Sequence, residues 1–386
     1  MTLLRRALQR ELVDFLDKLQ GNDLDIAKVS KAAFCKARKK LKPVAFVKLN
    51  QILLDTFYAS DNATVKLWKG YRLLASDGST VEVPNSDEVQ QEWGVFTTRS
   101  DGKKICLAHL EQTYDVLNNM ALVSSIDSFN VSELPLFWQH LEQIVPCQET
   151  DLHILDRYYA NFLLIFYLHH RGDQFCFRMK KHWQVVKDFY DSDQQDITIT
   201  LNLSSKDRKQ AKMLGITQHQ LTCRLVKVSL DSGETEILLT SLVDRSVSIE
   251  DLKELYGLRW GVETSYAALK HKAELENFSG RSIRAIKQDY FAKVFILNYT
   301  ALIIQPVDRL LQKAPRKKHI HQVNRNEALA RMKYATIDLF LFENIKATLE
   351  KLFDMFYRFT EPIRKGRKFN RHKIPKRKYP RNQCPV

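Results

Sequence analysis

The spacing of apolar residues changes near residue 70, and this change decides which class of fold the chain can adopt. Residues 1–65 place apolar side chains at helical spacing, as in Leu12, Phe15 and Leu19. From Tyr71 the stretch YRLLASDGSTVEV alternates every second residue, which is typical of a half-buried strand. The pattern predicts a small helical domain followed by a domain built on a sheet.

Strands and helices then alternate along the chain. KKICLAHLEQTYDVL and NMALVSSIDS have the pattern of strands, and Ser132 opens the helical stretch SELPLFWQHLEQIV. LHILD and QFCFRMK are expected as strands on either side of a helix in RYYANFLLIFYLHHRG, and the Asp-Gly pair in YRLLASDGSTVEV predicts a turn. This order indicates an α/β layer architecture.

Residues 181–247 have a different pattern. DITITLNL, HQLTCRLVKVSL and TEILLTSLVD resemble strands with no long helix between them, which predicts a β-rich insertion. Ser248 then begins a capping-box sequence, SIED, and a helix is expected to run from there to about Glu276. Further helices are expected over residues 282–304 and 337–360.

The chain carries a large excess of positive charge. Lys and Arg outnumber Asp and Glu by 60 to 45, giving a formal charge of +15. Ten Lys and Arg residues and no acid lie between Arg364 and Arg381, and a smaller cluster, KAAFCKARKKLK, lies between Lys31 and Lys42. A merely solubilising tail is the alternative, but such clusters favour a polyanionic partner because phosphate neutralisation releases counterions. The tail lacks the apolar face that membrane-surface binding requires.

Targeting signals and metal-binding cysteine patterns are missing from the sequence. Apolar runs such as Phe162–Leu168 are far shorter than the ~20 residues that span a bilayer. The first residues mix acids and bases without the apolar segment of a signal peptide. The six cysteines have no zinc-type spacing. We expect a soluble protein of a reducing, cytoplasmic compartment.

The stretch YGLRWGVETSYAALK places four polar residues on one side of an expected helix. At about 100° per residue, Tyr256, Arg259, Glu263 and Lys270 fall within an arc of about 60°. A solvated helix face is the ordinary explanation of such a stripe. The aromatic residues beside it, Trp260 among them, instead favour a lined cleft.

Two aspartates stand where strands are expected to end. Asp77 closes YRLLASD and Asp156 closes LHILD. Taken singly, the first is explained by a turn and the second by a helix cap. Together with Glu263 they provide three carboxylates that an α/β fold can bring to one edge of a sheet. Clustered carboxylates repel one another without a cation, and their oxygens suit Mg²⁺ or Mn²⁺, so a metal site is predicted.

These motifs resemble those of a known family. The spacing of Tyr256, Arg259, Glu263 and Lys270 is similar to the Tyr-Arg-Glu-Lys signature of the insertion-sequence-four family of DDE transposases. SDGS around Asp77 and LDRYYAN around Asp156 resemble that family's first and second acidic segments. SKAAFCKARKKL resembles its N-terminal region, so the resemblance covers most of the chain.

The resemblance implies a fold and a domain order. The fold class is α/β: an RNase H-like mixed sheet with flanking helices, interrupted by a β-rich insertion, plus a small N-terminal helical domain. Residues 1–65 would bind DNA, and residues 346–386 would form a C-terminal helix and basic tail. The catalytic domain would be split into residues 66–180 and 248–345 by the insertion over residues 181–247.

The resemblance also implies the site and its partners. Asp77, Asp156 and Glu263 would be catalytic and would bind two Mg²⁺ or Mn²⁺ ions. DNA contacts would come from Arg157, Tyr256, Arg259, Trp260 and Lys270, with a core position of Trp260 as the alternative. The partner would be double-stranded DNA, both terminal inverted repeats and target, bound by a homodimer in a bacterial cytoplasm at the nucleoid, with no role for a membrane.

Two other functions fit the same motifs. One is a DNA-binding derivative that no longer cleaves, although the presence of all three acids and the full signature argues against it. The other is a metal-dependent nuclease of RNase H-like fold that cuts DNA without strand transfer.

Overall fold

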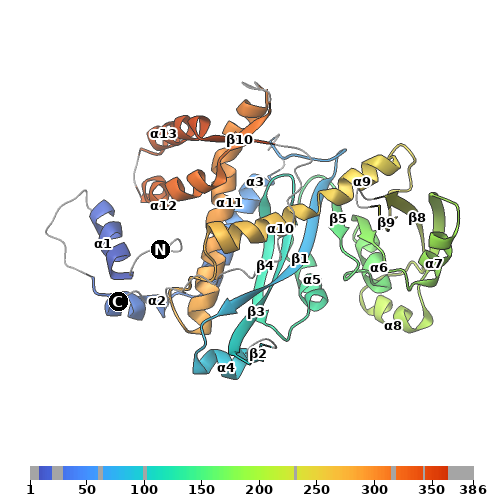
Figure 1. Cartoon of the computed structure of the whole chain (residues 1–386), viewed down its shortest axis with the longest axis horizontal. Helices are drawn as coiled ribbons and strands as arrows, with labels where there is room; N and C mark the ends of the chain where they lie inside the picture. The colour runs from blue at the N-terminus through green and yellow to red at the C-terminus, as the bar shows by residue number, and fades with distance from the viewer. Residues whose placement is uncertain are drawn as a thin grey trace. The chain divides into compact units, whose positions relative to one another are not determined.

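The computed structural model describes residues 8–19, 29–59, 64–98, 102–229, 233–313, 319–341 and 344–363 (Figure 1). The chain divides into two compact units. The first comprises Met1–Leu53, Thr80–Ala108 and Ala267–Val386, and the second comprises Leu54–Ser79 and His109–Tyr266. The predicted basic tail from Arg364 to Arg381 lies outside the described residues.

Nine of the described strands form one mixed sheet. Its order is β2-β3-β1-β5-β6-β9-β8-β7, with β4 paired to β3. Strand β5 pairs in parallel with β1 and β6, whereas β9, β8 and β7 continue the sheet in antiparallel fashion. The predicted α/β fold with a mixed sheet and flanking helices is confirmed, and its RNase H-like class stays a prediction. The strands are β1 (Arg72–Val83), β2 (Phe96–Thr97), β3 (Lys104–Asp115), β4 (Met120–Ser128), β5 (Asp151–Leu155), β6 (Gln174–Arg178), β7 (Asp196–Asn202), β8 (Gln220–Ser229) and β9 (Thr235–Thr240).

In the second unit, alternating side chains divide the sheet into two apolar faces. Phe175 and Phe177 of β6 pack in one buried cluster with helices α5 to α8, whereas Cys176 between them packs in a second cluster with α9. This is the two-residue period of a strand covered on both faces. The helices are α5 (Glu133–Leu141), α6 (Phe162–His170), α7 (Gln184–Asp191), α8 (Ser205–Met213) and α9 (Ile249–Gly257).

Strand β1 does not turn at its Asp-Gly pair. It runs without a break from Arg72 to Val83, so the predicted turn is wrong and Asp77 lies within a strand rather than at its end. Hairpin turns of the Asn-Gly and Asp-Gly type need positive φ at the glycine, and Gly78 is not among the glycines with positive φ. Gly78 instead avoids a clash, because a Cβ at this position would lie 2.3 Å from Oε1 of Glu133.

The segment 181–247 is less purely β than expected. It contains the short helices α7 and α8, and its strands β7, β8 and β9 join the same sheet as β6. The preceding helix, α6, begins at Phe162 because the side chain of Asn161 caps it by accepting a hydrogen bond from Leu164 N. The predicted domain boundaries remain predictions.

The long helix expected from Ser248 to Glu276 is broken. Its capping box is confirmed, since the side chains of Ser248 and Asp251 each accept a hydrogen bond from the other's backbone N–H. Helix α9 then ends at Gly257, α10 spans Trp260–Ala267, and a π-helix, η1, spans Ala268–Lys272. The join has i to i+3 hydrogen bonds, a tighter turn than the α-helix. The polar stripe therefore does not lie on one continuous helix.

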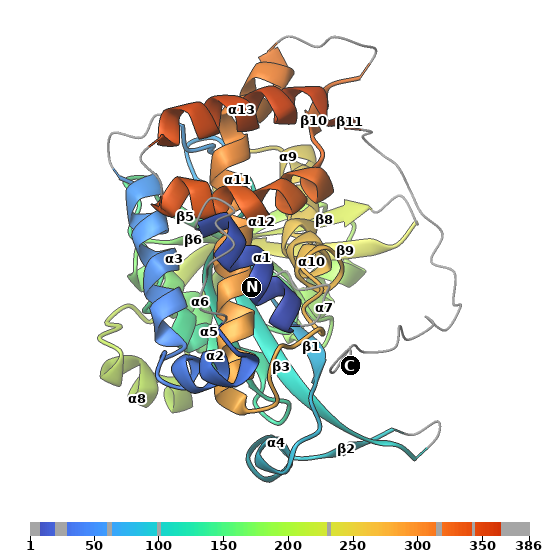
Figure 2. The ribbon, with the colours of Figure 1, turned by 90° about the vertical axis from the view of Figure 1, so that its left-hand side faces the viewer.

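The first unit is mainly helical. Its largest described cluster packs α11 against α12 and α13, and Figure 2 shows these helices side by side in orange and red. Two helices, α12 and α13, replace the single one expected over residues 337–360, and the side chain of Asn344 caps the second. The elements are α1 (Leu8–Leu19), α2 (Lys31–Arg38), α3 (Val44–Phe57), α4 (Asp87–Trp93), α11 (Ile283–Lys313), β10 (His321–Val323), α12 (Arg325–Leu341), α13 (Ile345–Arg358) and β11 (Thr360–Pro362).

By length and composition alone, α11 is long and apolar enough to cross a membrane. Of its most apolar window 56% is buried inside the structure, and the core helix of a soluble protein passes the same test. One such helix is weak evidence for a membrane span.

Candidate active site

Asp77 lies on β1, and Asp156 directly follows Leu155, the last residue of the neighbouring strand β5. Strands β1 and β5 pair in parallel with Ala75 opposite Ile154. Extending this register by two residues brings Asp156 next to Asp77, and the charge of Asp156 raises the pKa of Asp77. The sheet therefore brings together the two aspartates that the sequence analysis singled out.

Glu263 joins Asp77 through a buried guanidinium. Glu263 lies in the first turn of α10, and its Oε1 accepts a hydrogen bond of 2.9 Å from Nη2 of Arg259. Nη1 of Arg259 lies 3.9 Å from Oδ2 of Asp77, and the Arg259 side chain is only 8% exposed. Arg259 is thus placed between two of the three acids rather than on the surface.

Helix α10 is held against the sheet at two points. The hydroxyl of Tyr266 donates a hydrogen bond of 2.7 Å to the backbone oxygen of Asp77. A Cβ on Gly261 would lie 3.0 Å from the Cβ of Val116, so the helix backbone approaches the sheet as closely as a glycine permits. These contacts fix the position of Glu263 relative to β1.

The pKa of Asp77 depends on the charges of the other two acids. The pKa of Asp77 is raised from 3.8 to about 6, chiefly by burial and also by the charges of Glu263 and Asp156, while the charge of Arg259 opposes the shift. The Asp77 side chain is 25% exposed, so the group is open to solvent on one side. An arginine alone does not balance this group of carboxylates.

Two further acids near Asp77 were missed by the sequence analysis. Glu111 of β3 is fully buried, and burial raises its pKa well above the usual range. The pKa of Glu133, at the start of α5, is raised by burial and by the charges of Asp77 and Asp156. Nothing in the sequence distinguished Glu133 from an ordinary acid in a first helical turn.

The residues expected to contact DNA differ in exposure. Arg157 is exposed directly after Asp156, and Trp260 is 50% exposed, which excludes the alternative of a core tryptophan. Tyr256 is only 7% exposed, and its hydroxyl has no hydrogen-bond partner. Lys270 is half-buried on η1 in the first unit, and its role remains a prediction.

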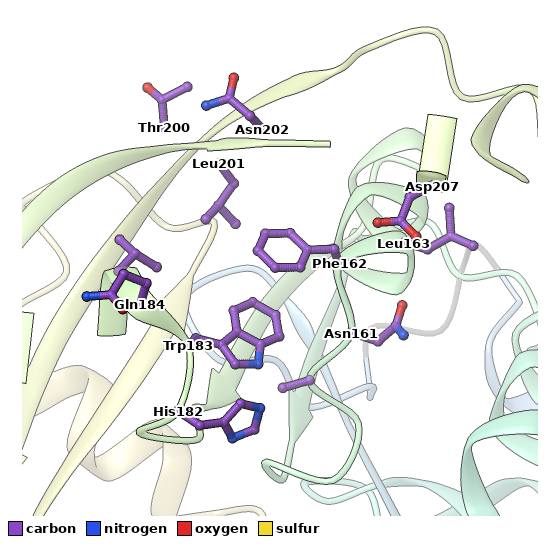
Figure 3. Close-up of a pocket in the computed structure, with 12 residues that line it drawn as sticks. Asn161, Phe162, Leu163, His182, Trp183, Gln184, Thr200, Leu201, Asn202 and Asp207 are labelled. Atoms are coloured by element: carbon purple, nitrogen blue, oxygen red, sulfur yellow. The ribbon is translucent and has the colours of Figure 1, made fainter. Parts of the chain in front are cut away.

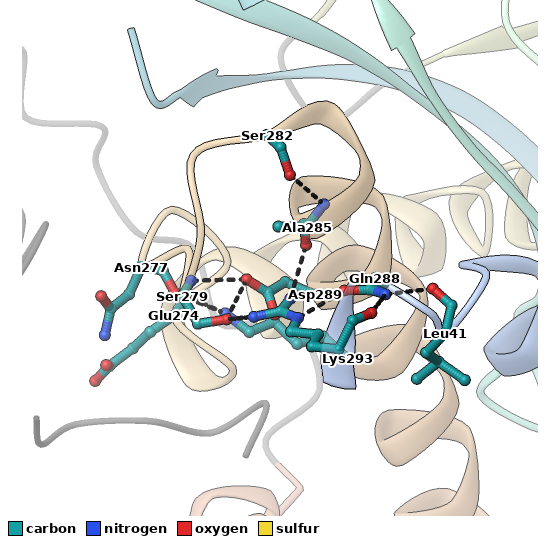
Figure 4. A network of polar contacts seen from close by, with 10 residues as sticks. Leu41, Glu274, Asn277, Ser279, Ser282, Ala285, Gln288, Asp289 and Lys293 are labelled. Atoms are coloured by element: carbon teal, nitrogen blue, oxygen red, sulfur yellow. Dashed lines mark hydrogen bonds and ion pairs between the residues drawn. The ribbon is translucent and has the colours of Figure 1, made fainter. Parts of the chain in front are cut away.

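In the N-terminal basic segment, Arg38 has a structural role. Its guanidinium donates hydrogen bonds to Gln288 Oε1 at 2.6 Å and to Asp289 Oδ1 at 2.7 Å, which joins α2 to α11. The same aspartate accepts a hydrogen bond of 2.7 Å from the Ser279 backbone N–H (Figure 4). The lysines around Arg38 are exposed instead: Lys31, Lys36, Lys39, Lys40 and Lys42.

A pocket of about 610 Å³ opens in the second unit away from the three acids. At its centre Phe162 and Trp183 stack with ring centroids 4.3 Å apart and planes at 10° (Figure 3). Asn161 and Asn202 contribute polar groups to its wall. None of the predicted site residues lines it.

A different cluster has metal-ligand spacing. Ligand atoms of Asp151, His153 and Asp173 lie within 4.8 Å of one another. Asp151 accepts hydrogen bonds of 2.6 and 2.8 Å from Arg72, and Asp173 accepts one of 3.0 Å from Arg171. Since arginines already compensate both carboxylates, this cluster is a structural ion-pair network.

Comparison with known proteins assigns the family. The family model described as transposase DDE domain matches residues 68–299 of the 386-residue chain, a span that contains Asp77, Asp156 and Glu263. The chain belongs to the transposase DDE domain family. DDE transposase domains use divalent metal ions. The carboxylates around Asp77 fit such ions, because hard oxygen donors suit Mg²⁺ and Mn²⁺.

Structural comparison finds a match among solved structures. A cryo-EM structure of a piggyBac transposase synaptic complex with hairpin DNA matches with 9% sequence identity and a TM-score of 0.42. The match covers 73% of this chain and 57% of that chain, so this chain spans less than two thirds of the length of that one. The search among curated proteins finds no match.

Proposed function

We propose that this transposase is of the insertion-sequence-four type. It binds the terminal inverted repeats of an insertion sequence as a homodimer in a bacterial cytoplasm, cleaves the DNA strands at its ends and joins them to target DNA. The observation that carries the proposal is the placement of Asp77, Asp156 and Glu263 in one compact unit, with Arg259 between two of them.

In this proposal the three acids hold two Mg²⁺ or Mn²⁺ ions. When bound, such ions supply Lewis-acid stabilisation of the attacking and leaving oxygens in an in-line phosphodiester displacement. The chain's own contribution is position: the β1–β5 register sets Asp77 opposite Asp156, and the Tyr266 hydrogen bond holds α10 with Glu263 against β1. Metal ligands that are already held in place need no rearrangement during the reaction.

The exposed residues at the site contact the DNA in this proposal. Arg157 is directed to a phosphate beside Asp156, where its fork of donors gives bidentate contact. Trp260, half exposed beside Arg259, offers a face on which an unpaired base can stack. Tyr256 and Lys270 complete the proposed DNA contacts, and the Arg259 guanidinium is retained between the acids until cations compensate them.

The basic segments supply affinity that does not depend on DNA sequence. The exposed lysines between Lys31 and Lys42 and the Lys/Arg run from Arg364 to Arg381 would neutralise backbone phosphates. We therefore assign DNA binding to residues 1–65 and to the C-terminal tail.

The test is strand cleavage and joining on defined DNA. The full chain is incubated with labelled duplexes ending in the inverted repeats that flank its gene, with a target plasmid and Mg²⁺. Cleavage followed by joining supports the proposal. Cleavage without joining identifies a nuclease, and binding without cleavage identifies an inactive derivative.

A matched pair of variants makes this test specific to the site. Glu263→Gln keeps the size of the side chain and removes its charge, whereas Glu254→Gln makes the same change on the preceding helix, outside the site. We expect Glu263→Gln to lose cleavage by at least about a hundredfold, the range for loss of a group that stabilises the transition state. Glu254→Gln is expected to cleave at the wild-type rate.

A further inference from the structure

Helix α2 ends against the first two turns of α11, and both helices lie in the first unit. Nε2 of Gln288 donates a hydrogen bond of 3.1 Å to the backbone oxygen of Arg38. The same atom donates one of 2.6 Å to the backbone oxygen of Leu41 (Figure 4). The Arg284 guanidinium donates another to the backbone oxygen of Lys39, 245 residues earlier in the chain. The last carbonyl groups of a helix have no partner within the helix, so α11 supplies the donors that satisfy the end of α2.

The two segments that meet here carry charge of one sign. Residues 29–54 contain seven Lys and Arg residues and no acid, and residues 277–288 contain three and no acid. The next acid along α11, Asp289, is 5% exposed and accepts hydrogen bonds from Arg38 and Ser279. The surface of a soluble domain usually mixes both signs of charge. The contact between α2 and α11 therefore joins two positive segments without placing an acid between them on the surface.

Four exposed cations of this region form no ion pair with any residue in the described part of the chain: Lys36, Lys39, Lys40 and Arg284. An exposed cation elsewhere in the same unit has a partner, since Arg358 lies 2.6 Å from Asp354. Acids begin only at α4, where Glu88 accepts a hydrogen bond of 3.2 Å from the backbone N–H of Ile283. The four cations thus form a positive surface bounded on one side by α4.

A solvated face is the ordinary explanation of exposed lysines. Arg284 does not fit that explanation, because its hydrogen bond holds a guanidinium beside Lys39 and Lys40 rather than beside an acid. Like charges held together raise the electrostatic energy of the free protein, and a bound polyanion lowers it. The fork of donors on an arginine also matches the geometry of a phosphate.

We propose that the end of α2 and the first turns of α11 form one DNA-binding surface, on which Lys36, Lys39, Lys40 and Arg284 contact phosphates of the same duplex. The inference rests on the proposed function and extends its DNA contacts from the N-terminal segment to α11. Contacts of this kind add affinity that does not depend on DNA sequence.

The test measures binding of a short labelled duplex without inverted repeats to the full chain in EDTA, at increasing concentrations of NaCl. Arg284→Gln removes the charge and keeps a donor for the Lys39 carbonyl. We expect it to reduce the slope of log affinity against log salt by about 1. Arg284→Lys keeps the charge and should retain the wild-type slope. The control is Arg358→Gln, at a side chain 71% exposed on α13, which should also retain it.

A double variant tests whether the two helices contact the same duplex. Lys40→Ala combined with Arg284→Gln should reduce the slope by about 2, with unchanged stoichiometry. A double variant that loses no more than Lys40→Ala alone would overturn the shared surface. A wild-type slope in Arg284→Gln, or an equal loss in Arg358→Gln, would overturn the role of Arg284. Thermal unfolding of each variant confirms that it is folded.

Strand cleavage by the same preparations separates failure of this inference from failure of the proposed function. If the wild type cleaves and joins DNA while Arg284→Gln retains the wild-type slope, α11 makes no DNA contact and the proposed function stands. If the slopes change as expected but no cleavage occurs, the surface is confirmed and the proposed chemistry fails. If the wild type binds no duplex, both proposals fail.

Discussion

Nη2 of Arg259 lies 2.9 Å from Oε1 of Glu263, while Nη1 of the same guanidinium lies 3.9 Å from Oδ2 of Asp77. One buried arginine thus compensates two acids that are proposed to share cations. The sequence motif alone suggested that Arg259 holds a phosphate; the structure gives it a part in balancing the site's charge.

Replacing Arg259 is expected to make stability depend on divalent cations. Arg259→Gln should lower the free energy of unfolding by about 1.5–3 kcal/mol, the range for hydrogen bonds to charged groups. Saturating Mn²⁺ should restore part of this loss, because the cation takes over the compensation of Asp77 and Glu263. Urea unfolding with and without Mn²⁺ measures both effects.

The control for this experiment is Arg245→Gln. Arg245 forms an ion pair with Asp196 and has a side chain 50% exposed, so its loss should cost less than about 1 kcal/mol. Mn²⁺ should not restore that loss. If Mn²⁺ stabilises wild type and Arg259→Gln by the same amount, Arg259 does not substitute for a cation.

The raised pKa of Asp77 predicts a pH dependence of stability in the absence of divalent cations. Between its ordinary pKa of 3.8 and its folded pKa of about 6, the folded chain retains a proton that the unfolded chain has lost. The free energy of unfolding should therefore fall as pH rises through this window, by about 3 kcal/mol in total at about 1.4 kcal/mol per pH unit. Asp77→Asn has no such group.

The measurement compares urea unfolding of wild type and Asp77→Asn across that pH window. Subtracting the two curves removes the contribution of the carboxylates whose pKa does not depend on the charge of Asp77. The difference should change between about pH 4 and pH 6 and be constant above it. If the difference between wild type and Asp77→Asn does not change with pH in this window, the pKa of Asp77 is not raised in the folded chain.

Helix α10 is expected to tolerate no larger residue at Gly261. Alanine normally stabilises a helix interior relative to glycine by about 1 kcal/mol. Here the added Cβ would meet Val116 at 3.0 Å, so Gly261→Ala should destabilise the chain, by about 1–3 kcal/mol as overpacking does. In a Val116→Gly background, which removes both the Cβ and the Cγ1 that the new methyl group would meet, the same substitution should be neutral or stabilising, and a double-mutant cycle by thermal unfolding tests this.

In the N-terminal segment, substitution of Arg38 should affect stability, whereas substitution of Lys40 should affect DNA affinity. Arg38→Ala removes the bonds to Gln288 and Asp289 and should lower the free energy of unfolding by about 3–5 kcal/mol, as loss of one partner of a buried ion pair does. Lys40→Ala, at an exposed position, should leave stability unchanged. It should reduce the slope of log affinity against log salt for duplex DNA by about 1. A salt-dependence change in Arg38→Ala alone would contradict this division.

The sequence predicted the strands on which the candidate site is built because they depend on local pattern. Alternation identified the strand of Asp77 and the strand that precedes Asp156. The exposure of Trp260 and the break between α9 and α10 were not predictable from local pattern, because both depend on tertiary packing.

Two features were misread because a local rule had a stronger tertiary competitor. The Asp-Gly pair at residue 77 is a turn signal, but the structure uses Gly78 for the space it leaves to Glu133. Glu133 itself follows Ser132 as an ordinary first-turn acid, so no local pattern connects it to Asp77. Such long-range contacts can be recognised only when the positions of the strand and the helix in the structure are known.

The most direct test of the account is the location of Mn²⁺ in a crystal of the full chain. An anomalous difference map should show the ion among the carboxylates of Asp77, Asp156 and Glu263, with the Arg259 guanidinium withdrawn from Glu263. Density instead at Asp151, His153 and Asp173, or none beside Asp77, would contradict the assignment of the site.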